Sequence, residues 1–312
     1  MLNNFCEKKV TKELPMDWQN QLITVYLTSC KFFSQLSPYI FLKISPNSNP
    51  SFTDEETVTI YIFGILNELK NIKSIFKFTK NFLSEWFPNL PSYEGFLFRL
   101  NNLNHLFPEL SKFILKNKKF KLNLDSTKPF VLIDSLPIIL AKGFRAHKCN
   151  TAKEISSVGF CSSKNLYYFG LKLHLTALFK NNRLASPLSM KITRAATHDL
   201  TAVKNDLLNL NHSELFADRA YCDQFTKQKL AKKNSNLHTP IKLSRSKKTL
   251  SNDEKVYSKS VSSIRQSIEI LFNWLIESSG IQTASKVRST KGLLVHVFGR
   301  FSACLFKYMF FF

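Results

Sequence analysis

An unbroken apolar run leads directly into Asp134 in the stretch VLIDS, residues 131–135. Such a run is typical of a buried central strand, so the carboxylate at its end needs a partner. Two later segments supply one: a second short apolar run ends at Asp218, and a helical pattern over residues 263–278 contains Glu269. Two acids on strands and one on a helix form the arrangement that holds two divalent cations for phosphoryl transfer.

Carboxylates are the residue type that this chemistry requires. Attack on a phosphodiester needs an acidified nucleophile and a stabilised leaving oxygen, and two metal ions ~3.5 to 4 Å apart provide both. Mg2+ prefers carboxylate oxygens and keeps several of its waters, whereas a zinc site would use His or Cys. The sequence therefore predicts that Asp134, Asp218 and Glu269 are catalytic and bind two Mg2+ ions, with Mn2+ as a substitute.

Each acid alone has an ordinary structural explanation. Asp134 could cap a turn, and Asp218 could pair with the adjacent Arg219. Glu269 could form an i, i+4 pair with Arg265 on a helix surface. The joint pattern favours a site, because two of the acids end apolar strands and the third borders the apolar stripe of its helix.

The chain is strongly and unevenly basic. Its 312 residues carry a formal net charge of +22. Residues 1–120 contribute +4, from 14 basic and 10 acidic residues, and residues 121–312 contribute +18, from 30 and 12. An electropositive surface around a small acidic centre suits an enzyme whose substrate is DNA or RNA. The alternative is a basic surface that serves only solubility.

The six cysteines form no CxxC pair. His147, Cys149 and Cys161 could be imagined as zinc ligands, but a fourth ligand and the usual spacing are missing. We therefore expect free thiols in a reducing cytoplasm. The N-terminus, MLNNFCEKK, lacks the apolar run of a secretory signal.

The end of the chain, residues 293–312, is apolar and about as long as a membrane span. It contains His296, Arg300 and Lys307 at near-helical spacing, which would be costly in lipid. We predict a packed C-terminal helix and no membrane partner, with a membrane anchor as the alternative.

The first part of the chain has the periodicity of helices. Thr53, with Glu56 three residues later, predicts a capping box. The predicted helices cover residues 14–45, a segment that begins at Thr53, residues 73–87, and residues 93–103 after a cap at Ser92. The three short helices from Thr53 onward could form a helix-turn-helix that reads DNA ends, or an ordinary helical support domain, and the sequence leaves both open.

From residue 121 the pattern changes to strands and helices in turn. Predicted strands cover residues 131–140, 167–178, 184–193, 215–221 and 237–243, and predicted helices cover residues 201–210, 224–233 and 263–278. This order predicts a mixed α/β sheet flanked by helices. A basic loop is expected over residues 141–166 and a solvated loop over residues 242–255.

Five segments occur in an order and spacing that match a known family. The residues concerned are Asp134 in VLIDSLPI, Gly170, Lys172 and His174 in YYFGLKLHL, His198 and Asp199 in ATHD, Asp218 in FADRAY, and Arg265 and Glu269 in RQSIE. The chain resembles bacterial insertion-sequence transposases of the DDE type, and most closely the insertion-sequence 982 family. Two N-terminal segments, FTDEETVTIYIF and FPNLPSYEGFLFRLN, are also similar, so the resemblance covers roughly residues 50–310.

This resemblance implies an RNase H-like DDE catalytic domain over residues 121–312, with Asp134, Asp218 and Glu269 as the metal-binding triad. A helical domain over residues 1–120, with DNA-end binding as one interpretation, would precede it. The implied activity is hydrolysis at the ends of a DNA element, followed by attack of the freed 3′-hydroxyl on target DNA.

Two details of the resemblance concern which residues belong to the site. His198 and Asp199 look like a structural turn in the family, so they are left out of the triad. Related transposases often have a Tyr and a later Lys on the last catalytic helix, where this chain has Ser262 and Ile276. The DNA contacts near the active site therefore stay open.

The expected partner is double-stranded DNA, both the terminal inverted repeats of the element and the target. A homodimer is expected, because synapsis joins two ends, and the expected location is the bacterial cytoplasm at the nucleoid. The predicted DNA-binding residues are Lys142, Arg145, Lys148, Lys172, Arg219 and Arg265. Two alternatives remain: a decayed or repurposed DNA-binding protein derived from a transposase, and a non-transposing nuclease with the same core.

Overall fold

The computed structural model describes residues 17–36, 50–117, 128–207, 210–242 and 249–311. Contacts divide the chain into two compact units, Met1–Phe96 and Leu97–Phe312. The sequence had suggested a boundary at residue 120. The division falls earlier because helix α5 (Leu106–Asn117) packs against α11 (Arg300–Phe310), which places α5 in the second unit.

The described part of the first unit is built from helices. They are α1 (Trp18–Ser34), α2 (Asp54–Leu66), α3 (Ile72–Phe82) and the first turn of α4 (Tyr93–Asn102). The capping box predicted at Thr53 and Glu56 is confirmed, and Ser92 accepts a hydrogen bond from the backbone N–H of Gly95 at 3.1 Å. Of the helix expected over residues 14–45, residues 18–34 are helical, and residues 37–49 lie outside the described part of the chain.

Helix α2 is the core of this unit. Every residue from Thr57 to Ile65 is buried, because α1 packs on one side of the helix and α3 on another. The sequence suggested one core-facing stripe at 3.6-residue spacing. The helix is instead apolar around its whole circumference, which is typical of a fully enclosed helix.

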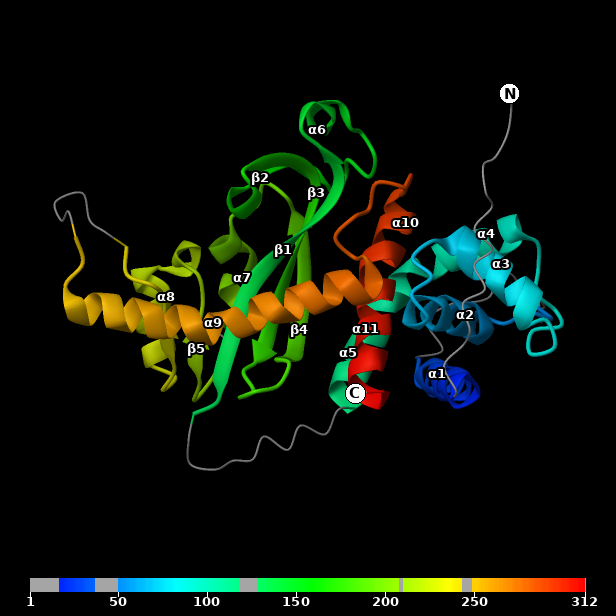
Figure 1. Ribbon diagram of the computed structural model, residues 1–312, viewed down its shortest axis with the longest axis horizontal. Coiled ribbons are helices and arrows are strands. Elements are labelled where there is room, and N and C mark those ends of the chain that lie inside the picture. The colour runs from blue at the N-terminus through cyan, green and yellow to red at the C-terminus, as the bar shows by residue number, and fades with distance from the viewer. Residues whose placement is uncertain (1–16, 37–49, 118–127, 208–209, 243–248, 312) are drawn as a thin grey trace, which may run out of the picture. The chain divides into compact units, whose positions relative to one another are not determined.

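The second unit contains a mixed six-stranded sheet (Figure 1). Its strands are β1 (Phe130–Lys142), β2 (Ser157–Cys161), β3 (Leu166–Leu178), β4 (Ser186–Arg194), β5 (Glu214–Phe216) and β6 (Asn236–His238). The order is β2-β3-β1-β5-β6, with β4 also paired to β3. The pairs among β1 to β4 are antiparallel, whereas β5 pairs in parallel with β1 and β6 pairs in parallel with β5. The predicted mixed α/β class is confirmed.

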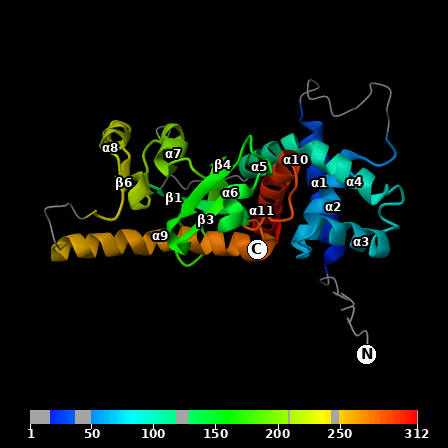
Figure 2. The same cartoon turned by 90° about the horizontal axis from the view of Figure 1, so that it is seen from above.

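Helices cover both faces of the sheet. Helix α9 (Asn252–Ser279) runs along one face, and α7 (Asp199–Leu207) and α8 (Gln224–Ala231) lie on the opposite face (Figure 2). On the α7 and α8 face, Ala202 and Leu230 pack against Val131 and Ile133 of β1. Because side chains alternate along a strand, Asp134 faces the other side, toward α9.

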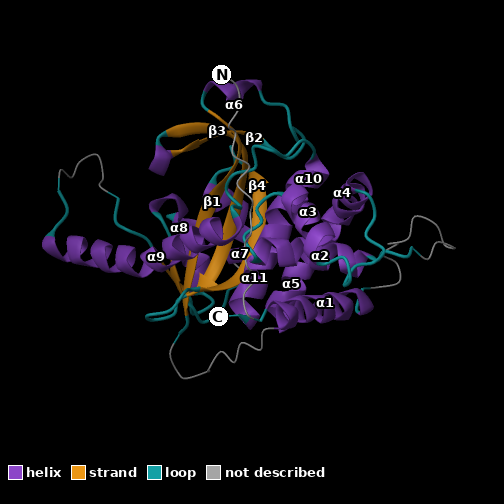
Figure 3. Cartoon of the chain, turned by 45° about the vertical axis from the view of Figure 1, so that its right-hand side comes forward, coloured by secondary structure: helices purple, strands orange, loops and turns teal. Residues whose placement is uncertain are grey.

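The segment between β1 and β3 differs from the prediction of a basic loop over residues 141–166, which was wrong. It contains α6 (Phe144–Lys148), β2 and the short helix η2 (Ser162–Lys164). Helix α6 and the paired strands β2 and β3 stand together at one end of the sheet (Figure 3). Strand β2 escaped prediction because its five residues include Gly159 and an exposed Phe160 in place of an alternating apolar pattern.

The solvated loop expected over residues 242–255 was wrong in its second half. Residues 252–255 form the first turn of α9, because Ser251 and Glu254 make a capping box. The motif Ser-x-x-Glu in the sequence is the signal for that start. Residues 243–248 lie outside the described part of the chain.

The C-terminal segment forms one continuous helical run of α10 (Thr290–Leu294), the π-helical turn η4 (Val295–Gly299) and α11. By length and composition alone, residues 290–310 could cross a membrane, but most of this stretch is buried inside the protein. His296 and Arg300 are buried and bond the carbonyl oxygens of Ile281 and Ser279. The packed C-terminal helix expected from the sequence is therefore observed.

Candidate active site

Strand pairing places two of the predicted acids beside each other. The parallel ladder between β1 and β5 pairs Val131 with Leu215 and Leu132 with Phe216. Asp134 and Asp218 each stand two residues beyond that last pair. Asp218 follows the end of β5 at Phe216, as the sequence suggested. The expectation that Asp134 also ends its strand was wrong, because β1 continues to Lys142 through its pairing with β3. The two neighbouring parallel strands thus place both carboxylates at the same level of the sheet, next to each other.

Helix α9 supplies the third acid. Its buried face includes Ile268, Leu271 and Leu275, which hold the helix against the sheet. Arg265 and Glu269 are one turn apart on the border of that face, as the apolar stripe predicted. They therefore point along the sheet toward the two aspartates.

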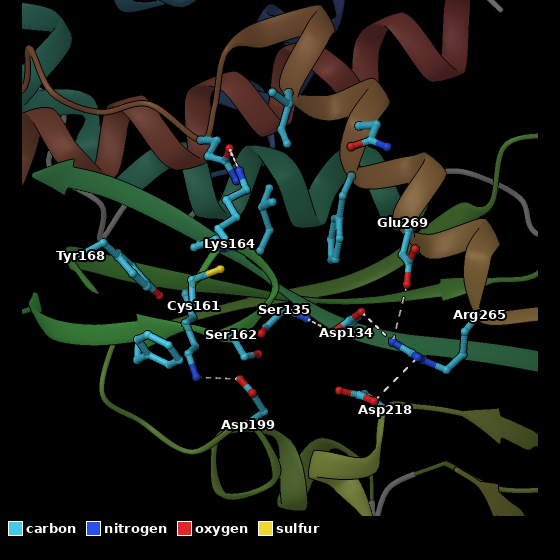
Figure 4. A pocket seen from close by; sticks show the side chains of 18 residues that line it. Asp134, Ser135, Cys161, Ser162, Lys164, Tyr168, Asp199, Asp218, Arg265 and Glu269 are labelled. Atoms are coloured by element: carbon cyan, nitrogen blue, oxygen red, sulfur yellow. Dashed lines mark hydrogen bonds and ion pairs between the residues drawn. The ribbon is translucent and has the colours of Figure 1, made fainter. Parts of the chain in front are cut away.

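One guanidinium lies among the three acids (Figure 4). Arg265 Nη2 donates to Asp134 Oδ2 at 3.1 Å and lies 3.9 Å from Glu269 Oε1, and Nη1 lies 3.8 Å from Asp218 Oδ1. The arginine side chain is only 11% exposed, Asp134 is 21% exposed, and Asp218 and Glu269 are 50% and 57% exposed. Asp134 is thus the innermost acid, and the other two face the solvent.

The surroundings of Asp134 have opposing effects on the pKa of its carboxyl group. Burial raises its pKa to about 6, against the lowering effects of Arg265 and of the hydrogen bond from Ser135 N to Oδ1 at 2.8 Å. The neighbouring Asp218 and Asp199 raise the pKa further. A carboxylate that is buried and surrounded by other acids is stabilised in its charged form by any added cation.

The acids line a cleft of about 500 Å³. Further charged residues lie in its wall, among them Lys172 and Asp199: Lys172 Nζ donates to Asp199 Oδ1 at 3.1 Å and to Thr197 O at 3.0 Å. Asp199 was interpreted from the sequence as part of a structural turn, and it is in addition a fourth carboxylate of the cleft. Its position in the cleft could not be predicted from the neighbouring sequence, because its partner Lys172 is on a different element.

The predicted DNA-binding residues fall into three groups. Arg265 and Lys172 lie inside the cleft and are engaged in ion pairs. Arg219 is exposed beside Asp218. The other three are exposed at the end of β1 and on α6: Lys142, Arg145 and Lys148.

Several residues of the cleft were missed by sequence reasoning. Lys164 Nζ donates to Gln282 Oε1 at 2.7 Å, which links the turn after β2 to the segment after α9. Phe160, Tyr168 and Phe272 form aromatic parts of the wall. Phe160 could not be placed from the sequence because β2 was not predicted, whereas Tyr168 and Phe272 are on the predicted elements β3 and α9 and were missed as residues of the site.

The three acids are of the donor type that a hard divalent cation prefers. Among the described residues, no three His, Cys, Asp or Glu side chains are gathered closely enough to hold a metal ion, and Arg265 lies between the three acids instead. All three are carboxylates, and a single guanidinium cannot balance three of them.

A family model described as a transposase DDE domain matches residues 125–289, more than half of the chain. The chain therefore belongs to this family, which indicates an enzyme that acts on DNA. No curated protein and no solved structure matches the chain. The matched range contains Asp134, Asp218 and Glu269.

Proposed function

We propose that this protein is a DNA transposase of the insertion-sequence 982 type, which hydrolyses phosphodiester bonds at element ends and transfers the freed 3′-ends into target DNA. One observation carries the proposal. Within the matched domain, Asp134, Asp218 and Glu269 converge from β1, β5 and α9 on the guanidinium of Arg265 in one cleft.

The sheet supports an RNase H-like catalytic domain over residues 121–312. Three antiparallel strands, in the order β4-β3-β1, are followed on the other side of β1 by the parallel strands β5 and β6. Asp134 is on β1 and Asp218 directly follows β5, the two strands at which the antiparallel part of the sheet meets the parallel part. The helices before residue 121 would serve DNA-end binding in this proposal.

Asp134, Asp218 and Glu269 would hold Mg2+ or Mn2+. Such ions acidify the attacking water or 3′-hydroxyl and stabilise the leaving oxygen. Within the chain, the backbone N–H of Ser135 fixes one oxygen of Asp134 at 2.8 Å, so its other oxygen is directed into the cleft. Asp218 is fixed in the same way, since Arg219 N donates to its Oδ1 at 2.6 Å. These hydrogen bonds preorganise the two aspartates.

The first prediction concerns the acids. Purified protein should nick DNA that carries the gene's own flanking sequence, at defined ends and only with Mg2+ or Mn2+. Asp218→Asn and Glu269→Gln should lower cleavage by at least about 100-fold, because each removes a ligand charge that counts mainly in the transition state. Binding of the same DNA, measured by fluorescence anisotropy, should change by less than about threefold.

Matched controls come from α9, the helix that contains Glu269. Asp253→Asn and Glu277→Gln replace exposed acids of α9 outside the cleft, and both should cleave like the wild-type protein. If Asp218→Asn lost binding and cleavage equally, its assignment to the reaction would be wrong. Tight binding without any cleavage by the wild-type protein would identify a decayed, DNA-binding relative. Cleavage without strand transfer would identify a nuclease.

Synapsis of two element ends implies two copies of the chain, so the proposal includes a homodimer on DNA. Light scattering of the protein with and without end DNA measures this directly. A complex that contains a single protein chain at saturating DNA would contradict the proposed homodimer.

A further inference from the structure

Three aromatic side chains are exposed on α6, β2 and β3, and one of them, Phe160, also lines the cleft. Phe144 on α6 is 77% exposed, Tyr167 on β3 is 55% exposed, and Phe160 on β2 is 46% exposed. Together we call them the aromatic strip. Contact of large aromatic side chains with water is unfavourable, so a group of three exposed ones that reaches a candidate active site through Phe160 indicates a binding surface.

The members of the aromatic strip are held by the fold. Phe160 and Tyr167 are cross-strand partners, and their ring centroids are 4.9 Å apart. Gly143, at a φ of +54°, begins α6 and donates its N–H to the carbonyl of Tyr167 at 3.0 Å, which places Phe144 beside this strand. The His147 ring follows at 6.1 Å from the Tyr167 ring.

The surroundings of the aromatic strip are basic. Between residues 142 and 168 the chain has five basic residues and one acid, Glu154. Lys148 Nζ lies 4.6 Å from the centre of the Phe144 ring, and Arg145 is exposed on the same short helix. Aromatic faces interleaved with Lys and Arg provide stacking for bases and ion pairs for phosphates, the combination that binds unpaired nucleic acid strands. A basic surface without aromatic residues would suffice for a duplex backbone.

The aromatic strip leads into the cleft. Phe160 belongs both to the strip and to the wall that contains Asp134. Behind it lies Tyr168, which is 1% exposed and extends its hydroxyl toward Cys161 (Figure 4). That hydroxyl has no hydrogen-bond partner within the described part of the chain. A buried polar group without a partner costs free energy, and a ligand that enters the cleft can satisfy it.

We propose that the aromatic strip binds an unpaired segment of DNA strand that leads to the three acids, so that the protein acts on ends whose base pairs have opened. The inference rests on the proposed function and extends it by naming the state of the substrate. Bases that lose their partners would stack on Phe144, Tyr167 and Phe160, and the strand would pass from α6 toward Asp134.

The test compares two DNA substrates made from the gene's flanking sequence, a perfect duplex and the same duplex with a short unpaired tail. 2-Aminopurine in the tail reports stacking, because its fluorescence is quenched against an aromatic ring. Binding is measured in EDTA, which prevents metal-dependent cleavage. We expect the wild-type protein to bind the tailed DNA more tightly and to quench the tail.

Phe160→Ala and Tyr167→Ala should each lose roughly tenfold affinity for the tailed DNA and most of the quenching, with duplex binding unchanged. Phe144→Ala, at the most exposed position, should act in the same direction without any risk to folding. Tyr167→Phe keeps the ring and should retain the preference for the tailed DNA.

The matched control is Phe225→Ala on α8. Phe225 is also exposed, and the centre of its ring lies 4.6 and 4.4 Å from the amines of Lys204 and Lys229.

Three results would overturn the inference alone. The first is duplex binding with no preference for the tail, and the second is a preference that all three alanine variants keep. A preference lost equally in Phe225→Ala would also overturn it, because any exposed phenylalanine would then suffice. A wild-type protein that binds neither DNA would overturn this inference and the proposed function together.

Discussion

At the scale of single residues, Arg265 decides the electrostatics of the site. Its guanidinium balances part of the charge of Asp134, Asp218 and Glu269, and it is the least exposed of the four side chains. The sequence suggested only an i, i+4 pair with Glu269. The closer contact is with Asp134, which lies 131 positions earlier in the chain. Such a contact depends on tertiary packing, which no local pattern encodes.

Replacement of Arg265 tests this balance. Arg265→Gln should lower the free energy of unfolding by about 1–3 kcal/mol in metal-free buffer, because the half-buried Asp134 loses its cation. The same variant should gain a larger increase in melting temperature from Mg2+ than the wild-type protein does, since a bound ion stabilises only the folded state. Thermal unfolding with and without Mg2+ measures both effects.

The control for that prediction is Arg219→Gln, which removes an exposed arginine next to Asp218 and should leave the melting temperature and its Mg2+ response nearly unchanged. An Arg265→Gln protein as stable as the wild type, with the same response to Mg2+, would show that the three acids do not depend on this arginine.

At the scale of elements, the accuracy of prediction followed the length of each apolar pattern. The long strands over residues 131–140 and 167–178 and the buried face of α9 were predicted, since each repeats its pattern over many residues. The three-residue strands β5 and β6 were predicted too long. Strand β5 ends at Phe216, and Asp218 then caps the helix η3 (Arg219–Tyr221). Strand β2 and α6 were not predicted at all. The three acids could thus be located from the sequence, whereas the aromatic strip could not.

Helix α9 positions two residues of the site, so its packing should control both stability and cleavage. Leu271 is fully buried against the sheet, and Leu271→Ala should cost about 2–5 kcal/mol, the usual range for a buried leucine. The neighbouring Ile270 is 52% exposed, and Ile270→Ala should cost less than about 0.5 kcal/mol. Urea unfolding of both variants measures the difference, and equal costs would mean that α9 is not anchored by this face.

At the scale of the whole molecule, the charge is the property that composition alone predicted best. The net charge of +22 lies mainly in the half of the chain that the family model matches. Folding then distributes it, since Arg265 and Lys172 turn inward to acids while Lys142, Arg145 and Lys148 remain exposed. The sequence could not separate these two groups, because the acids that bind the inward-facing residues come from other elements.

The exposed lysines and arginines should make duplex binding strongly dependent on salt. Each phosphate contact that releases a counterion contributes a slope of about −0.9 to the plot of log affinity against log salt concentration. Lys148→Gln should make that slope shallower by about one unit and weaken binding to all duplex sequences alike. Lys112→Gln, on α5 and paired with Glu109 at 2.7 Å, removes the same charge outside the predicted set and should leave the slope unchanged. A flat response of the wild-type protein to salt would contradict a broad basic surface for DNA, and equal slopes for the two variants would exclude Lys148 from it.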